Sequence, residues 1–394
     1  MWLTSFLLLP KVPITQSFGI LIGEIVLSVY FILYLIFINL KFNKILISYF
    51  LFNFCFFVVS SLYIMLFYQL YSIISIIYFT RILIYATIFF AVISVLRKKS
   101  EIYTIKRLIL FPILACWVIS FLVFIVNFVI KAPSAAEMLW YYEVGFRLIP
   151  IFGLTIDFSQ PTFLFANSAS GIVLCSLMVF LFLFTHNVEQ LSKYRILVLS
   201  ILICTPLLTL SRSGFAAAIL AILISLNPIN FKKGALRIKF LGIFIFVLIA
   251  VGCIDTLAEV NLGVSIQGRI LSSLSEGNLS TGRFERIKDI FIQYNASVSN
   301  MIFGLSNDIV LRNELTGYKH SESLVFDIIQ GGGMITVITF LIYIYMLIKL
   351  SSKSRYFAIL LKFYVCQFPV TYLIGGGDFH SPAIMYVTMI CFGL

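Results

Sequence analysis

The sequence is poor in charged residues, in histidine and in paired cysteines, and each shortage excludes a class of protein. Asp, Glu, Lys and Arg make up 11% of the 394 residues, whereas 61% are hydrophobic and 41 are Phe. Soluble domains average about 25% charged residues, so this composition excludes an ordinary soluble domain. The three His are not clustered with cysteine, so a structural zinc site is not expected. The seven Cys all fall in apolar segments without C-x-x-C spacing, and we expect them to be small buried side chains.

Long apolar runs, by contrast, are abundant. Several exceed the ~20 residues that span a hydrocarbon core about 30 Å thick. The predicted fold class is therefore all-α, a polytopic membrane protein with about 11 (10–12) transmembrane helices. The predicted spans are 14–40, 45–66, 70–96, 108–130, 162–184, 196–210, 214–226, 240–257, 324–350, 357–374 and 382–394. Residues 1–13 lack the basic start and cleavage site of a signal peptide, and we expect a short buried or half-spanning segment there.

Basic residues concentrate in five short connections between these spans, and acidic residues avoid them. Of the 16 Asp and Glu, only Glu101 and Glu189 lie in those connections. The five connections are KFNK (41–44), RKKSEIYTIKR (97–107), THNVEQLSKYR (185–195), NPINFKKGALRIK (227–239) and KLSSKSR (349–355). By the positive-inside rule they are cytoplasmic, so the net charge of +12 indicates orientation rather than nucleic-acid binding. The outer face receives 131–161, 258–323 and 375–381.

We expect one integral membrane domain in three parts. Residues 1–257 form an N-terminal transmembrane bundle, 258–323 an outward-facing loop with short amphipathic helices, and 324–394 the C-terminal transmembrane helices. A helix lying on the membrane surface is predicted around 283–294, because apolar residues recur there at helical spacing with charges between them. These apolar residues are Phe284, Ile287, Phe291 and Tyr294.

The segment LTLSRSGFAAAI places Arg212 between Ser211 and Ser213, with apolar sequence on both sides. The neighbouring connections are both cytoplasmic by charge, so the segment forms an outer turn. Its two arms would give roughly 22 Å and 18 Å of helix, too short to cross the bilayer comfortably. We interpret Arg212 as a buried anion-binding residue, with Ser211 and Ser213 satisfying freed backbone groups. An Arg that snorkels to the interface is the alternative.

The segment NLSTGRFERIKDIF is a second basic element. We expect Thr281 to cap a helix that opens at Arg283, and a helix start offers unpaired N–H groups suited to phosphate. Arg283 and Arg286, three residues apart, lie on neighbouring faces and can both reach one anion, and Arg269 is a further candidate. A solvated surface helix whose charges pair with one another is the alternative.

The segment KHSESLVFDIIQGGGM marks the return of the long loop to the membrane. In a helix, His320 and Asp327 lie near one face, and an ionisable group such as Asp327 in the outer leaflet is a candidate functional residue. A neutral His can accept a hydroxyl proton or bind a sugar, although His320 can equally cap or pack. The glycines of 331–333 permit close packing or local unwinding. In GGGDFHS, Asp378 and His380 are second-choice acid–base or substrate-binding candidates.

At SRSG, TGRFE and His320-Ser321, with Gly331 ten residues beyond that serine, the chain resembles the O-antigen ligase and polymerase (Wzy/WaaL) superfamily. The resemblance is concentrated in residues 205–335. It implies a multi-pass protein of the bacterial inner membrane, with one large periplasmic loop and an active site facing the periplasm. The family often has Asn where this chain has Ser321, and the ligase pattern that starts at Gly331 ends here in Met334. These departures favour polymerase over ligase.

The resemblance implies an inverting, metal-independent glycosyltransferase without a cofactor. It would transfer the growing glycan from undecaprenyl pyrophosphate to the non-reducing-end sugar of a lipid-linked repeat unit. Arg212, Arg283 and Arg286 would then stabilise the charge on the leaving pyrophosphate, and His320 would orient or deprotonate the acceptor hydroxyl. The expected partners are the lipid-linked oligosaccharide and the bilayer, with no nucleic acid and with a chain-length-determining co-polymerase left open. The alternatives are an O-antigen ligase that uses lipid A-core and, less favoured, a lipid-linked oligosaccharide flippase.

Overall fold

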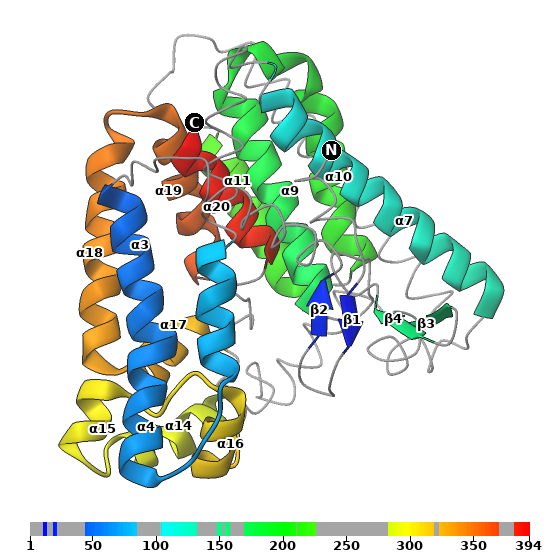
Figure 1. Ribbon diagram of the computed structural model, residues 1–394. Helices are drawn as coiled ribbons and strands as arrows, with labels where there is room; N and C mark the ends of the chain where they lie inside the picture. The colour runs from blue at the N-terminus through cyan, green and yellow to red at the C-terminus, as the bar shows by residue number, and fades with distance from the viewer. Residues whose placement is uncertain are drawn as a thin grey trace, which may run out of the picture.

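The computed structural model describes part of the chain, and expectations that fall elsewhere lie outside the described residues. The described residues are 11–13, 19–21, 44–84, 103, 105–131, 148–151, 154–157, 169–209, 211–225, 283–318, 323–369 and 382–394. Helices make up most of them (Figure 1). The helical class predicted from the sequence is therefore confirmed for this part of the chain, with one small sheet as an exception.

Apart from 14–40, every predicted span that the structure describes is helical. The helical elements are α3 (Lys44–Phe54), a π-helical stretch (Cys55–Val59), α4 (Ser60–Tyr68), the helix Ile74–Ile84, a π-helical stretch (Lys106–Leu110), α7 (Phe111–Lys131), α9 (Ala169–Asn187), a 3₁₀ stretch (Glu189–Tyr194), α10 (Arg195–Leu208), α11 (Arg212–Ser225), α14 (Arg283–Tyr294), α15 (Val298–Phe303), α16 (Ile309–Thr316), α17 (Leu324–Phe326), a π turn (Asp327–Gly331), α18 (Gly333–Ser351), α19 (Arg355–Gln367) and α20 (Pro382–Gly393). Among the described residues, two helices are long and apolar enough to cross a membrane, namely Lys44–Tyr68 and Gly333–Ser351.

A four-stranded antiparallel sheet corrects the prediction at the start of the chain. Its strands are β1 (Lys11–Pro13), β2 (Gly19–Leu21), β3 (Leu148–Ile151) and β4 (Leu154–Asp157), in the order β2-β1-β4-β3. The span predicted at 14–40 is therefore wrong at its N-terminal end, because Gly19–Leu21 pairs with β1 instead of entering a helix. Pairing between strands satisfies the same backbone groups that a helix would satisfy internally. Lys11 pairs with Asp157, which joins the start of the chain to the predicted outer segment 131–161.

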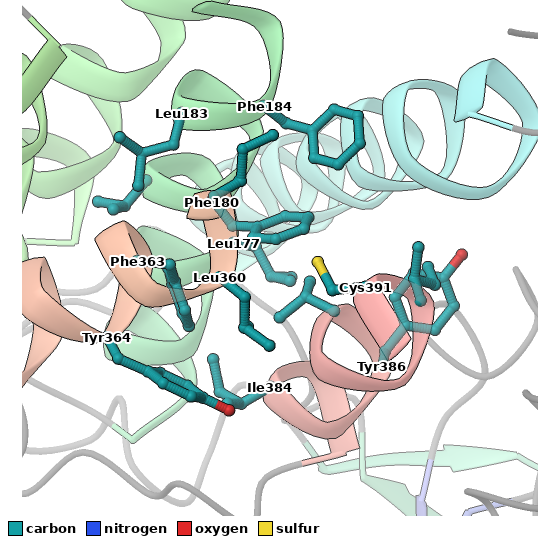
Figure 2. Close-up of a cluster of buried hydrophobic side chains, with 14 of the residues drawn as sticks. Leu177, Phe180, Leu183, Phe184, Leu360, Phe363, Tyr364, Ile384, Tyr386 and Cys391 are labelled. Carbon is teal, nitrogen blue, oxygen red and sulfur yellow. The ribbon is translucent and has the colours of Figure 1, made fainter. Parts of the chain in front are cut away.

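Helix α9 lies at the centre of the helical core. From Ile172 to Thr185 every side chain is buried, as expected for a helix surrounded by other helices. Figure 2 shows side chains of α9, α19 and α20 directed toward one another, including Phe180, Phe363 and Cys391. The rings of Phe180 and Phe363 lie edge to face with centroids 5.7 Å apart. The expectation for the cysteines is confirmed for five of the six described ones, which are buried, whereas Cys204 is partly exposed. The buried five are Cys55, Cys116, Cys175, Cys366 and Cys391.

Helices α9 and α19 run antiparallel, and so do α3 and α18. On the first pair, Phe184 contacts Tyr356 with ring centroids 5.8 Å apart, one helical turn beyond the Phe180 contact. On the second pair, Tyr49 meets Tyr343 at 5.5 Å, and residues later in α3 meet earlier residues of α18. These contacts place the start of α3, the end of α9 and the connection from α18 to α19 at one end of the bundle.

We call this the basic end, because it carries three of the five basic connections, 41–44, 185–195 and 349–355. Lys362 of α19 donates to Asn187 Oδ1 at 2.7 Å there, which ties α19 to the last residue of α9. The other end of the bundle is formed by the end of α4, the start of α18 and the helices α14, α15 and α16 (Figure 1). We call it the loop end. In the described part of the chain, these three basic connections thus lie at the opposite end of the bundle from residues 283–318 of the long loop.

Candidate functional site

The long loop forms a folded cap of three helices at the loop end. Helix α14 has the bounds Arg283–Tyr294, which confirms that the predicted segment is helical. Its Ile287, Ile290 and Tyr294 are buried, whereas Lys288 and Asp289 are exposed. Ile290 and Tyr294 pack with Leu305 in a small apolar cluster separate from the main core. The apolar face of α14 therefore packs on protein and holds the first turn of the helix, where Arg283 lies, at the loop end.

Close backbone contacts dock the cap onto the start of α18. A π turn covers Asp327–Gly331, and Gly333 adopts a left-handed conformation with φ 68°. A Cβ on Gly331 would lie 2.1 Å from Asn307 Oδ1, so no larger residue fits there without a shift. Gln330 donates its side-chain Nε2 to the carbonyl of Ile287 in α14 at 2.9 Å. The predicted close packing and local unwinding at glycines 331–333 are both confirmed.

Asp308 connects the same cap to the segment that follows α4. Its Oδ1 caps α16 by accepting the N–H of Val310 at 2.9 Å, and its Oδ2 accepts Ser72 Oγ at 2.8 Å and the N–H of Ser75 at 2.9 Å. Asp308 is fully buried, and these bonds satisfy its carboxylate. Nearby, Ser61 of α4 and Ser306 share a buried hydrogen bond of 2.7 Å. The cap is thus held against both α4 and α18.

Asp327, one of the predicted site residues, pairs with an arginine that the sequence reasoning missed. Arg312 of α16 donates Nη1 to Asp327 Oδ1 at 2.5 Å and is itself only 1% exposed. A buried carboxylate needs a cation or several donors, so an acid placed in an apolar helix was a signal to search for a partner. Arg312 is the only Arg between Arg286 and His320 in the sequence. That search would have found it.

Arg286, a second predicted site residue, lies over the ring of Tyr318 with its Cζ 5.6 Å from the ring centroid. The hydroxyl of Tyr318 donates to Asp289 Oδ2 at 2.9 Å, so this tyrosine contacts α14 at both its ring and its hydroxyl. Tyr318 precedes His320 by two residues in the sequence. These contacts place Tyr318 against α14.

The SRSG segment forms the break predicted between two short helices. Helix α10 ends at Leu208, and α11 begins at Arg212. Ser211 is fully buried, and its Oγ accepts the N–H of Gly214 at 3.1 Å, which confirms that it satisfies a freed backbone group. Ser213 Oγ lies 3.4 Å from Ser211 Oγ.

The position of this break along the bundle follows from its contact with α9. Thr209 Oγ1 lies 3.4 Å from Cys175 Sγ, and the next residue of α9, Ser176, donates to Gln367 Oε1 at 3.1 Å. Gln367 is the last residue of α19, whose other end lies at the basic end. The backbone at Arg212 is therefore in the half of the bundle nearer the loop end.

The remaining predicted site residues lie outside the described part of the chain. They are Arg269, His320, Asp378 and His380, together with the side chains of Arg212 and Arg283. Within the described part, no group of three or more His, Cys, Asp or Glu side chains is placed to hold one metal ion.

Comparison of this chain with protein-family models, with curated proteins and with solved structures finds no match.

Proposed function

We propose that this chain is a polytopic glycosyltransferase of the bacterial inner membrane that polymerises a surface polysaccharide in the periplasm. Its donor is the growing glycan on undecaprenyl pyrophosphate, and its acceptor is one lipid-linked repeat unit. The acceptor hydroxyl oxygen forms a bond to the anomeric carbon of the donor while the bond to pyrophosphate breaks. The hydroxyl proton passes to a base, and undecaprenyl pyrophosphate leaves with the bonding electrons. The configuration at the anomeric carbon inverts.

The observation that carries the proposal is the placement of two helices that begin with arginine. Arg212 opens α11 and Arg283 opens α14, and both helices begin on the side of the bundle away from the three basic connections. A helix start offers free N–H groups and a positive dipole end, and a guanidinium adds a permanent charge. Pyrophosphate gains negative charge as its glycosidic bond breaks, so fixed positive groups at this end favour the transition state.

The contact of Arg286 with Tyr318 supports the role proposed for His320. Two residues of extended chain reach at most about 7 Å, so covalent geometry keeps His320 near Tyr318. In the proposed reaction Arg286 assists in holding the pyrophosphate, and His320 orients or deprotonates the acceptor hydroxyl. Asp327 lies seven residues further along and is held by Arg312. The acid–base group and Arg286 would then come from neighbouring parts of the chain.

The composition of α9 argues against the flippase alternative. A flippase needs a hydrated path from one end of the bundle to the other, lined with polar groups. The central helix α9 is instead buried and almost entirely apolar from Ile172 to Phe184. An O-antigen ligase would use the same pyrophosphate site with a different acceptor, so the ligase alternative is decided by experiment.

Deletion of the gene in its host distinguishes these functions. A polymerase predicts that the deletion strain retains lipid A-core carrying a single repeat unit and loses the long-chain ladder on a polysaccharide gel. Bare core together with accumulated lipid-linked polymer would instead identify a ligase. An unchanged ladder would contradict both. A plasmid copy of the chain should restore the ladder and serves as the control.

A further inference from the structure

Arg312 is a fully buried cation with only part of its hydrogen-bonding capacity used. Its side chain is 1% exposed, although arginine keeps its charge in proteins. Nη1 donates to Asp327 Oδ1 at 2.5 Å and also contacts Asn307 Oδ1 at 3.4 Å. Within the described chain, the buried Nε and Nη2 atoms donate to no acceptor. Buried donors are almost always satisfied in native proteins, so these two atoms require an explanation.

The two unsatisfied donors of Arg312 share one edge of the guanidinium group. The N–H of Nε and one N–H of Nη2 point in the same direction in the guanidinium plane. Together they match the two oxygens of a carboxylate or a phosphate, which is the bidentate geometry that arginine favours. Asp327 contacts Nη1, outside this edge.

Arg195 shows what the same edge binds elsewhere in this protein. Its Nε donates to the carbonyl oxygen of Thr185 at 3.1 Å, and its Nη2 donates to the carbonyl oxygen of His186 at 3.0 Å. Two oxygens from consecutive residues therefore satisfy this edge at the basic end. The corresponding edge of Arg312, among the residues that the structure describes, faces no such pair.

We propose that the Nε–Nη2 edge of Arg312 is a binding site for an oxyanion, either phosphate or carboxylate. The side chain of Asp327 is 18% exposed, so solvent reaches the carboxylate that contacts Nη1 of the guanidinium. The negative charge of Asp327 opposes an incoming anion at the same cation. The natural ligand follows from the proposed function, and it is the diphosphate of the lipid-linked donor or the carboxylate of an acidic sugar. Both present the same pair of oxygens.

Thermal melts of the full chain purified in detergent test this site. The probes are sodium pyrophosphate and sodium glucuronate, compared with sodium chloride at equal ionic strength. At least one probe should raise the apparent Tm of the unsubstituted protein by about 2 °C or more over chloride. Arg312→Lys keeps the charge but lacks the two-donor edge, and it should clearly reduce the rise. Arg195→Lys makes the same change where the edge is already satisfied, and it should leave the rise intact.

The possible outcomes distinguish a phosphate site from an acidic-sugar site, and both from the absence of a site. A response to pyrophosphate alone identifies a phosphate site, and a response to glucuronate alone identifies an acidic-sugar site. No rise over chloride, or an equal rise in Arg312→Lys, overturns the proposal. If Arg312→Lys does not fold, Asp327→Asn provides the test. Removal of the nearby negative charge should make the rise in Tm larger than in the unsubstituted protein. An equal or smaller rise overturns the proposal. The melts measure binding only, so their failure leaves the proposed polymerase reaction to be judged by the deletion strain.

Discussion

Gly304 and Gly331 approach each other so closely that a Cβ on Gly304 would lie 2.2 Å from the carbonyl oxygen of Gly331. Gly304 also has a φ of 82°, a conformation that residues with a side chain rarely adopt. The backbone of the next residue, Leu305, donates to the carbonyl of Gln330 at 2.8 Å across the same contact. This backbone contact joins the three-helix cap to the start of α18, and through it the candidate site to the bundle.

Gly304→Ala should therefore detach the cap and sharply lower the apparent Tm of the purified protein. Gly317→Ala is the matched control, because Gly317 has a similar φ of 76° but no atom within 4 Å of the added Cβ. The control variant should lose only the free energy that a residue with a Cβ needs to adopt a left-handed conformation, about 1–2 kcal/mol of stability. Gly304→Ala adds a clash with backbone atoms that cannot move aside, and the ψ of 176° at Gly304 lies outside the left-handed region that Gly317 occupies, so this variant should lose clearly more stability. Equal losses in the two variants would show that the contact with Gly331 is not needed.

The packing of SRSG against α9 gives a second prediction. A Cβ on Gly214 would lie 2.5 Å from Cys175 Sγ and 2.8 Å from its Cβ. Gly214→Ala should destabilise the protein, and Cys175→Ala in the same chain should relieve part of the loss, with a coupling energy of about 1 kcal/mol. Cys116→Ala is the matched control, since Cys116 is also buried but lies on another helix.

Thermal melts of the single and double variants measure this coupling. The pair Gly214→Ala and Cys116→Ala should be additive within about 0.5 kcal/mol. Additive losses for Gly214→Ala with Cys175→Ala would mean that α9 does not restrict the approach of the SRSG segment.

His186, in the predicted cytoplasmic connection 185–195, should make the stability of the folded protein depend on pH. Burial lowers the pKa of His186 below its usual range, and the Arg195 cation lowers it further. The unfolded chain takes up this proton near pH 6.5, before the folded protein does. The stability linked to His186 is thus fully present above about pH 6.5 and declines as the pH falls below it.

Removal of the imidazole should remove that part of the decline. His186→Gln should lose less apparent Tm than the unsubstituted protein between pH 7.5 and pH 5.5. The measurement is the difference between the two proteins at each pH, since other groups titrate equally in both. An identical decline in the two proteins would show that His186 does not carry the effect.

The helices were predictable from the sequence because each apolar run is a local property of the chain. The span 45–66 corresponds to the continuous helix Lys44–Tyr68, and the surface helix at 283–294 was predicted with its observed bounds. The strand Gly19–Leu21 was missed because it is three residues long and is defined by its partner β1 and, through β1, by β4 far along the chain. Such pairing leaves little trace in local composition.

The site was predictable only in part, for a similar reason. Arginines next to helix starts and an acid in an apolar helix carry local signals, so Arg212, Arg283 and Asp327 were identified as candidates. Arg312 has no local signal of that kind, because its burial results from the docking of α16 against the π turn that contains Asp327. The two residues are separated by fifteen positions, and only the folded cap brings them together.

The most direct test of the proposed function is the glycan chain length produced by a deletion strain that carries Arg212→Ala or Arg283→Ala. Lys193→Ala is the matched control, because Lys193 is a cation in a connection at the basic end. We predict that both arginine variants remain in the membrane and lose the long-chain ladder, and that the lysine variant keeps it. Normal ladders from both arginine variants, at normal protein levels, would contradict the proposal that these residues stabilise a pyrophosphate leaving group.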